Sequence, residues 1–363
     1  MKKKLVVSAV SLTEGGTLTV LRECLKAAVD DLGGNWDIIA LVHDKALINL
    51  PSVQCIEFPK AKRSWLRRLY YELHAFKKLS RQLDADLWLS LHDLTPNVEA
   101  RRHAVYCHNP SPFYDVSFRE VLLSPVFYVH YLAYPFVYKH NIGRNHSVVV
   151  QQKWLRDEFQ QRYGAGRVVV AHPVESAVAE RQERPCGVPV VFFFPALARF
   201  FKNFEVICQA AEILAQGGVS GFEVRMTIAG SDNRYAAGLI ERFGNVPGLR
   251  FIGRQDGVQM RAHYEQADCL LFPSKLETWG LPITEAKAAH LPMLVADVRY
   301  AHETVGTYDR VRFFPPEDGA ALADLMRQFI EGSIAFKDVV EADPAAPFAR
   351  DWSSLLSILT DGL

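Results

Sequence analysis

The chain has 363 residues, of which 49% are hydrophobic, and this length suits about two domains of roughly 150 residues each. Its 41 basic residues balance 41 acidic ones, so no overall positive field favours nucleic acid as a partner. The six cysteines have no C-x-x-C motif and no regular spacing, a pattern that indicates buried, reduced thiols in a cytosolic protein: Cys24, Cys55, Cys107, Cys186, Cys208 and Cys269.

The amino terminus, MKKKLVVSAVSL, has a basic start followed by a short apolar run. The run is too short for a secretion signal, and no small-residue cleavage site precedes Glu14. We therefore interpret it as a first core strand. The most apolar stretch, 121–138, is interrupted by Pro125, His130 and Pro135, so we expect no membrane-spanning helix there.

Short apolar runs alternate with helical segments along the first half of the chain. This alternation is typical of a parallel, doubly wound sheet. We predict helices at 17–31, 64–83 and 153–162, and strands at 4–10, 37–43, 53–58, 86–92, 103–108 and 146–151.

The same pattern restarts in the second half. Strands are expected at 167–171, 189–194, 224–229, 249–252, 269–272 and 293–296, and helices at 203–216, 234–243, 258–267, 282–290 and 319–331. The fold class is therefore α/β. The expected domains are 1–172 and 173–347, with the amphipathic end of the chain, 348–363, packing back on the first domain. We expect ligands at the carboxyl ends of both sheets, in a cleft between the domains.

The stretch from Phe272 to Glu285, FPSKLETWGLPITE, is the most informative in the sequence. Pro282 suits the first position of a helix, because its missing N–H would have no partner there. Glu285 would then fall in the first turn, and Glu277 would lie on the loop before it. The free N–H groups of that turn form an anion site. A sugar nucleotide needs this layout of two acids around a phosphate site.

The string PSKLETWGLPITEAKAAHLPMLVADVRYAHE at 273–303 resembles glycosyltransferase family 4, the retaining enzymes of the GT-B fold. The resemblance extends back through 251–274 and, less sharply, through 195–214, and weaker similarity reaches the amino terminus. It implies two Rossmann-like domains that face each other across a cleft. It also implies that the second domain binds a nucleoside diphosphate sugar.

The resemblance assigns roles to residues of the second domain. Glu277 binds donor-sugar hydroxyls, Glu285 binds the ribose hydroxyls, and Gly280 and Leu281 offer backbone N–H groups to the diphosphate. The alternative is that both acids are solvated. Lys202 matches the family lysine that binds the diphosphate. The family pattern has an arginine five residues before this lysine, where this chain has Leu197. We expect Arg199 to replace that arginine; the alternative is that Arg199 is an ordinary surface residue. The remaining expected donor-binding residues are Asn203, Gly230, Thr278 and Trp279.

In the first domain, the glycine pair Gly15–Gly16 follows the first strand, where backbone can approach a phosphate closely. Family members carry a glycine pair at this place. The resemblance also puts a histidine, here His108, at a strand end facing the donor sugar near the reacting carbon. His92 and Asp93 end the preceding strand, and we expect them on the acceptor side. The alternative for each histidine is a structural role.

Asp84-Ala85-Asp86 has the D-x-D spacing of metal-dependent glycosyltransferases of another fold. It falls at a helix-to-strand junction, where an acidic turn is common, so we reject a metal role. No set of His, Cys and carboxylate residues has zinc spacing. We therefore expect neither a metal nor another cofactor, with the sugar nucleotide as co-substrate.

The segment 60–81 holds eight Lys or Arg residues interleaved with aromatic and aliphatic ones. On a helix this composition suits a face that lies on an anionic membrane. An ordinary helix with one face in the core explains the pattern equally well. The aromatic run at 112–136 fits a membrane contact, a lid or an acceptor-binding wall.

These observations predict a metal-independent retaining glycosyltransferase that transfers a mannose-, rhamnose- or fucose-type hexose in O-antigen or capsule biosynthesis. We favour a GDP-linked donor and a polyprenyl-diphosphate-linked acceptor, and UDP-linked donors stay open. The expected location is the cytoplasm, with peripheral contact to the inner membrane. Two alternatives remain: an enzyme like UDP-N-acetylglucosamine 2-epimerase, and a non-catalytic subunit that binds sugar nucleotides.

Overall fold

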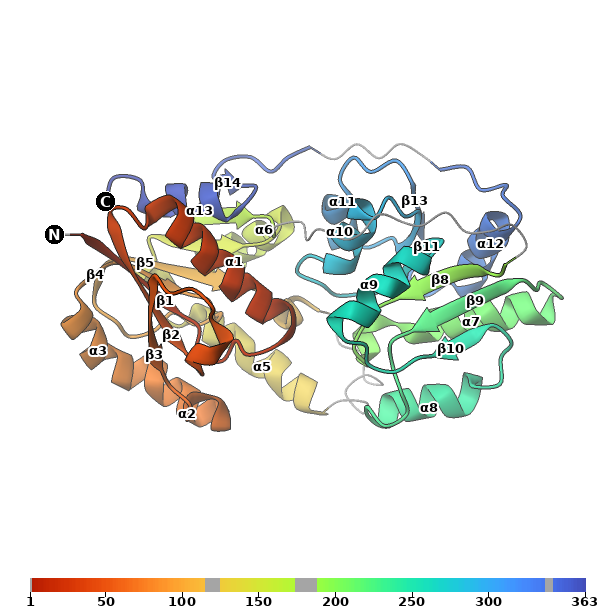
Figure 1. The fold of residues 1–363 in the computed structure, drawn as a ribbon, viewed down its shortest axis with the longest axis horizontal. Helices are drawn as coiled ribbons and strands as arrows, with labels where there is room; N and C mark the ends of the chain where they lie inside the picture. Colours follow the sequence, from red (N-terminus) through yellow and green to blue (C-terminus); the bar gives the residue numbers. More distant parts are fainter. Residues whose placement is uncertain (1, 115–124, 174–187, 337–341) are drawn as a thin grey trace. The chain divides into compact units, whose positions relative to one another are not determined.

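The computed structural model describes residues 2–114, 125–173, 188–336 and 342–363. The chain divides into two compact units (Figure 1). The first comprises Met1–Tyr114, Val126–Val174 and Pro344–Leu363, and the second comprises Asp115–Pro125 and Glu175–Asp343. The chain thus leaves the first unit near residue 174 and returns to it near residue 344.

The first unit is built on an eight-stranded sheet in which every recorded pairing is parallel. The strand order is β14-β7-β6-β5-β4-β1-β2-β3, so the order reverses between β1 and β4. These strands are β1 (Lys3–Ser8), β2 (Trp36–Val42), β3 (Val53–Glu57), β4 (Ala85–Ser90), β5 (Ala100–Cys107), β6 (Ser147–Val150), β7 (Val168–Ala171) and β14 (Phe348–Ala349).

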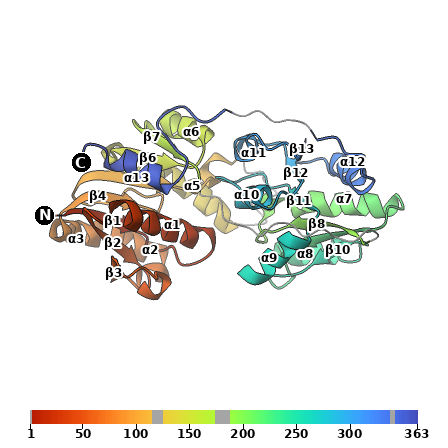
Figure 2. The ribbon, with the colours of Figure 1, turned by 45° about the horizontal axis from the view of Figure 1, so that its top comes forward.

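Helices cover both faces of this sheet, because successive side chains of each strand point to opposite sides. Helices α1 and α13 and helix α3 belong to this unit (Figures 1 and 2). Leu5 and Val7 of β1 pack into one apolar cluster with α1 and α13, whereas Val6 packs into another with Phe76 of α3. The helices are α1 (Gly15–Leu32), α2 (Trp65–Tyr70), α3 (Phe76–Leu83), α5 (Pro125–Lys139), α6 (Lys153–Tyr163) and α13 (Trp352–Thr360).

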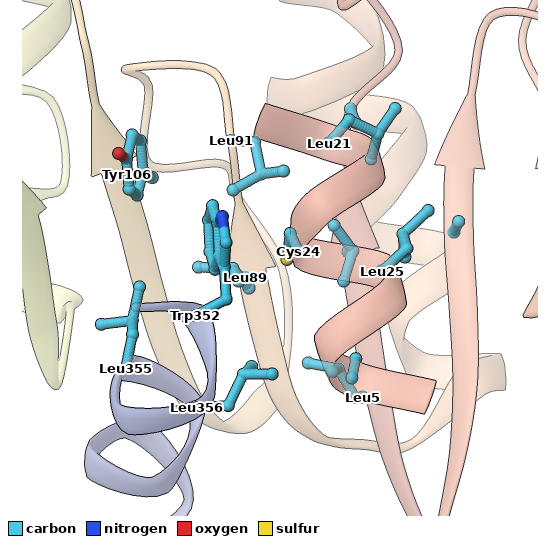
Figure 3. Packing of buried hydrophobic residues seen from close by; sticks show 14 of the residues in the cluster. Leu5, Leu21, Cys24, Leu25, Leu89, Leu91, Tyr106, Trp352, Leu355 and Leu356 are labelled. Atoms are coloured by element: carbon cyan, nitrogen blue, oxygen red, sulfur yellow. The ribbon is translucent and has the colours of Figure 1, made fainter. Parts of the chain in front are cut away.

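The end of the chain is part of the first core. Trp352, Leu355 and Leu356 of α13 are buried against α1 and the sheet (Figure 3). Asp351 starts this helix, since its carboxylate accepts a hydrogen bond from the backbone N–H of Ser354 at 2.7 Å. Apolar burial therefore fixes the returning segment to the unit in which the chain begins.

The second unit holds a six-stranded parallel sheet in the order β10-β9-β8-β11-β12-β13, which reverses between β8 and β11. Its strands are β8 (Val190–Phe194), β9 (Phe222–Met226), β10 (Leu249–Phe251), β11 (Cys269–Phe272), β12 (Met293–Ala296) and β13 (Val311–Phe314). Its helices are α7 (Phe204–Gln216), α8 (Arg234–Phe243), α9 (Gly257–Gln266), α10 (Leu281–Ala288), α11 (Arg299–Val305) and α12 (Gly319–Ile330).

The prediction of two parallel α/β sheets is confirmed, with local differences. The strand expected at 167–171 was grouped with the strands of the second half, although it falls within the expected domain 1–172; it is β7, which pairs with β6 in the first sheet. The helix expected at 64–83 is interrupted by a π-helical turn at Tyr71–Ala75. The sequence analysis did not predict β13, α5 or α11. The expected border at 173–188 lies almost entirely outside the described residues.

The cysteines fit the sequence expectation where they are described. Cys24, Cys107, Cys208 and Cys269 are buried, Cys55 is half-buried, and no disulfide joins any of these five. Cys186 lies outside the described residues.

Within the described ranges, no helix is long and apolar enough to cross a membrane. The same residues contain no group of three or more His, Cys, Asp or Glu side chains that could hold a metal ion.

The packing of α13 gives a first prediction. Replacing the fully buried Leu356 with Ala should lower the free energy of unfolding by about 2–5 kcal/mol, because a cavity is left in the first core. Urea unfolding of the whole chain, followed by tryptophan fluorescence, measures the change. The exposed Ser353→Ala variant is the control and should stay within about 0.5 kcal/mol of the parent. An unchanged midpoint for Leu356→Ala would contradict the packing.

Candidate functional site

The predicted donor residues of the second unit lie where its strand order reverses. Lys202 follows β8 and Glu277 follows β11, and these two strands are neighbours in the sheet (Figure 2). In open parallel sheets, ligands bind outside the carboxyl ends of the strands at this point. The ammonium of Lys202 and the carboxylate of Glu277 form a hydrogen-bonded ion pair, and both side chains are largely buried.

Backbone contacts hold the two loops together. Lys202 ends a short 3-10 turn, and the carbonyl of its neighbour Phe201 accepts a hydrogen bond from the N–H of Lys275 at 2.8 Å. Asn203 then turns the chain into α7 with a φ of 60°. Its side-chain amide donates to the carbonyl of Pro316 at 2.7 Å and to that of Pro273 at 3.3 Å. Asn203 therefore braces the loops, so the ion pair sits on a fixed frame.

The turn into α10 requires a glycine. Gly280 has a φ of 94°, and a Cβ at this position would lie 3.2 Å from the ring of Phe272. Trp279, just before it, is buried, and its indole N–H donates to Thr284 Oγ1 at 2.8 Å. The hydroxyl of Thr304 donates to the carbonyl of Trp279. The loop that carries Glu277 is thus anchored from α10 and α11, and Trp279 serves as one of its anchors.

Glu285 lies deeper in α10 than expected. The helix begins at Leu281, with Pro282 second, so Glu285 is its fifth residue and the first turn holds no acid. The expectation of a first-turn position was wrong by one residue, because the helix starts one residue earlier. Burial raises the pKa of the Glu285 carboxyl, and a hydrogen bond from the hydroxyl of Tyr264 opposes that shift.

The remaining predicted donor residues lie on the same loops or on the loop after the neighbouring strand β9. Arg199 is exposed and directly precedes the turn that ends at Lys202. Gly230 is exposed in the loop after β9, and Thr278 and Leu281 are half-buried beside Glu277 and Gly280. Their donor-binding roles stay predictions of the family resemblance.

In the first unit, the predicted residues also gather where the strand order reverses. Gly15 and Gly16 open α1 after β1, and Gly15 has a φ of 61° with open space around it. His92 follows β4 and is 1% exposed. Its Nδ1 lies 3.0 Å from the hydroxyl of Ser11, and its Nε2 is buried with no partner among the described residues. Burial, followed by the charges of Arg68 and His108, lowers the pKa of His92 well below its ordinary value.

Asp93 joins two strand ends. Its Oδ1 accepts hydrogen bonds from the backbone N–H groups of His108, at 2.7 Å, and Asn109, at 3.2 Å. The hydroxyls of Tyr134 and Tyr138, from α5, donate to the same carboxylate at 3.4 and 3.3 Å. Asp93 is 5% exposed. These contacts give it a role in holding His108 at the end of β5.

The imidazole of His108 is mostly buried beside that carboxylate. Its Nε2 lies 3.7 Å from Asp93 Oδ2, and its Nδ1 is buried without a partner in the part of the chain that the structure describes. A buried polar atom left without a partner is uncommon and marks a position where a ligand or water would be accommodated.

A buried ion pair that the sequence pattern does not predict lies close to these residues. Arg68 of α2 contacts Glu72 with an Nε–Oε1 distance of 2.9 Å and donates to the carbonyl of His92. Glu72 lies in the π-helical turn and is fully buried. Burial raises the pKa of Glu72, and the charge of Arg68 opposes the rise. The basic composition of 60–81 concealed this pair, because a pattern of charges does not show which one turns inward.

Known proteins resemble this chain in part of its sequence and in its fold. Residues 178–344 match the family model described as Glycosyl transferases group 1. A phosphatidyl-myo-inositol mannosyltransferase of Mycobacterium leprae is 28% identical over 123 residues, which are 34% of this chain and 31% of that protein's length.

Two solved structures are similar over most of their length. Sucrose-phosphate synthase from Thermosynechococcus elongatus has a TM-score of 0.64 at 15% identity, covering 92% of this chain and 90% of its own. WaaG, a glycosyltransferase involved in lipopolysaccharide biosynthesis, has a TM-score of 0.63 at 14% identity, covering 90% of both chains. The chain therefore has the GT-B fold, and its second unit carries the sequence pattern of the glycosyl transferases group 1.

Proposed function

We propose that this protein is a retaining glycosyltransferase that uses a nucleoside diphosphate sugar without a metal ion. The observation that carries the proposal is the Lys202–Glu277 ion pair at the carboxyl ends of β8 and β11, with Glu285 on the helix that follows. A cation there can neutralise a diphosphate, and carboxylates can accept hydrogen bonds from sugar hydroxyls. The match to glycosyl transferases group 1 covers all three residues.

The proposed reaction exchanges one bond at the anomeric carbon for another. The bond to the β-phosphate oxygen breaks, and a bond to the acceptor oxygen forms on the same face of the sugar. The departing β-phosphate takes the acceptor proton. Lys202 and Arg199 stabilise the negative charge that develops on the diphosphate. Glu277 holds the sugar hydroxyls, and the roles of His108, Gly15 and Gly16 follow the family resemblance.

For the substrates, we propose a GDP-linked hexose of the mannose, rhamnose or fucose type and a polyprenyl-diphosphate-linked saccharide acceptor. The relative named as a mannosyltransferase acting on phosphatidyl-myo-inositol supports both a mannose-type sugar and a lipid-bearing acceptor. The fold shared with a lipopolysaccharide glycosyltransferase fits a part in O-antigen or capsule synthesis. UDP-linked donors belong in the same assay.

The role of Glu277 can be tested by its removal. Glu277→Ala should lower the transfer rate by about 100-fold or more, because it removes a contact to the reacting sugar. The assay incubates the purified chain with GDP- and UDP-sugars and a synthetic lipid-linked acceptor and detects the glycosylated lipid. The control is Glu317→Ala, since Glu317 is an exposed acid that pairs with Lys275 at 2.6 Å.

The outcomes separate the candidate functions. Transfer by the parent chain supports a glycosyltransferase, formation of an epimer supports an epimerase, and binding without turnover supports a non-catalytic subunit. Near-normal transfer by Glu277→Ala would overturn the role proposed for this acid.

We also propose that the first unit binds an anionic membrane surface through α2 and α5. Of the large apolar side chains that the structure describes in this unit, six stand exposed by 44–77%, and all lie on these two helices: Trp65, Leu66, Tyr70, Val129, Leu132 and Phe136. The helices lie side by side (Figure 1), and Arg68 of α2 donates a side-chain hydrogen bond to the hydroxyl oxygen of Tyr134 of α5. Exposed Lys60, Lys62 and Arg63 precede α2, and exposed Arg67 lies on it. Apolar area beside basic charge suits an anionic bilayer surface.

Flotation with vesicles tests this surface. The whole chain should float with phosphatidylglycerol vesicles at low salt and less with neutral ones, because each basic residue near the surface adds about 1 kcal/mol of attraction. Leu66→Glu and Phe136→Glu should each reduce flotation. Val258→Glu is the matched control, since Val258 is 81% exposed but lies in the second unit. A chain that stays in the bottom fraction of the gradient with anionic vesicles at low salt would contradict the proposal.

A further inference from the structure

The buried Tyr264 of α9 is hydrogen-bonded to the half-buried Glu285 of α10 in the second unit. The hydroxyl of Tyr264 donates a hydrogen bond to Glu285 Oε2 at 2.5 Å. Tyr264 is 3% exposed, and its ring packs edge-on against Phe193 of β8 with 5.3 Å between centroids. Burial, followed by the charge of Glu285, raises the pKa of Tyr264 well above its ordinary value, so the hydroxyl keeps its proton.

The pair leaves one carboxylate oxygen available. No contact is recorded for Glu285 Oε1 within the described residues, and this atom is not a buried unsatisfied one. A carboxylate has two oxygens and accepts several hydrogen bonds. Tyr264 therefore fixes Oε2 and the plane of the group, and Oε1 keeps its acceptor capacity for a ligand.

We propose that Tyr264 is a positioning residue for nucleotide binding, which orients the Glu285 carboxylate toward the hydroxyls of a ribose. This inference rests on the proposed function and adds to it the residue that prepares the ribose subsite. A hydroxyl donor to a charged acceptor is stronger than a neutral hydrogen bond, and here it stands in a site largely removed from water. Orienting the carboxylate before the ligand arrives lowers the entropy lost on binding.

The same contact favours the ionised form of Glu285. Burial raises the pKa of the carboxyl, and the bond from Tyr264 lowers it. Tyr264 is the one titratable group recorded as acting on Glu285, within the part of the chain described. The nearest lysine on the same helix, Lys287, donates instead to the carbonyl of Thr304 at 3.2 Å. Without the Tyr264 hydroxyl, Glu285 would take up its proton at a higher pH.

The test compares GDP with 2′-deoxy-GDP, and UDP with 2′-deoxy-UDP, by calorimetry on the whole chain and its Tyr264→Phe variant. The parent should bind the ribonucleotide about tenfold more tightly than the deoxynucleotide, the value of one hydrogen bond to a charged group. In Tyr264→Phe this ratio should fall toward one. A general loss of stability would weaken the binding of both nucleotides equally. The ratio of the two affinities therefore separates a positioning role from a purely structural one.

The pH dependence gives a second readout. The ionised Glu285 carboxylate accepts hydrogen bonds from the ribose. Ribonucleotide affinity is therefore lost as the pH falls through the pKa of Glu285. Tyr264→Phe should move this acidic limb to higher pH. Tyr308→Phe is the matched control, because its hydroxyl donates to the carbonyl of Leu291 at 2.8 Å, outside the loops that carry Lys202 and Glu277. It should leave both the ratio and the limb unchanged.

The outcomes keep the two proposals distinct. A parent chain that binds neither GDP nor UDP would overturn the proposed function. A parent that prefers ribonucleotides, with an equal preference and an equal acidic limb in Tyr264→Phe, would overturn the positioning role alone.

Discussion

The ion pair between Lys202 and Glu277 is the interaction on which the candidate site depends. The two charges come from loops far apart in sequence, and they meet because β8 and β11 are neighbours where the strand order reverses. Both side chains are largely withdrawn from water, so removing one would leave the other charge uncompensated. Asn203 and the contact between Phe201 and Lys275 hold the loops at this spacing. The pair is therefore set in place by the fold before any ligand binds.

Much of this arrangement could be predicted from the sequence. Alternating apolar runs and helices indicated parallel sheets, and parallel sheets bring strand ends together at one edge. The resemblance to glycosyltransferase family 4 assigned Lys202 and Glu277 to one donor site, and the regular topology agrees with that assignment. The positive φ of Gly280 likewise has a local cause, since a Cβ would crowd Phe272. Features governed by local sequence or by regular topology could be predicted in this way.

Contacts between side chains that are distant in the sequence could not be predicted. The hydroxyl of Tyr264 is invisible in a hydrophobicity pattern, where tyrosine counts as one more apolar residue of α9. Arg68 appeared as one charge among eight, although it turns inward to Glu72. The composition of the strand at 167–171 suits either sheet, and it is the pairing with β6 that places this strand in the first sheet. In each case, a long-range partner decides the outcome, and no local pattern encodes that partner.

The helix α5 has two different sides. Val129, Leu132 and Phe136 face solvent, whereas Tyr134 and Tyr138 donate to the carboxylate that binds the backbone of His108. The one proton of the Tyr138 hydroxyl is shared between that carboxylate and the carbonyl of Asn109, which lies nearer, at 2.7 Å. A sideways movement of this helix would stretch these bonds and displace the end of β5 with it. The position of α5 and the position of the His108 imidazole are thus mechanically linked.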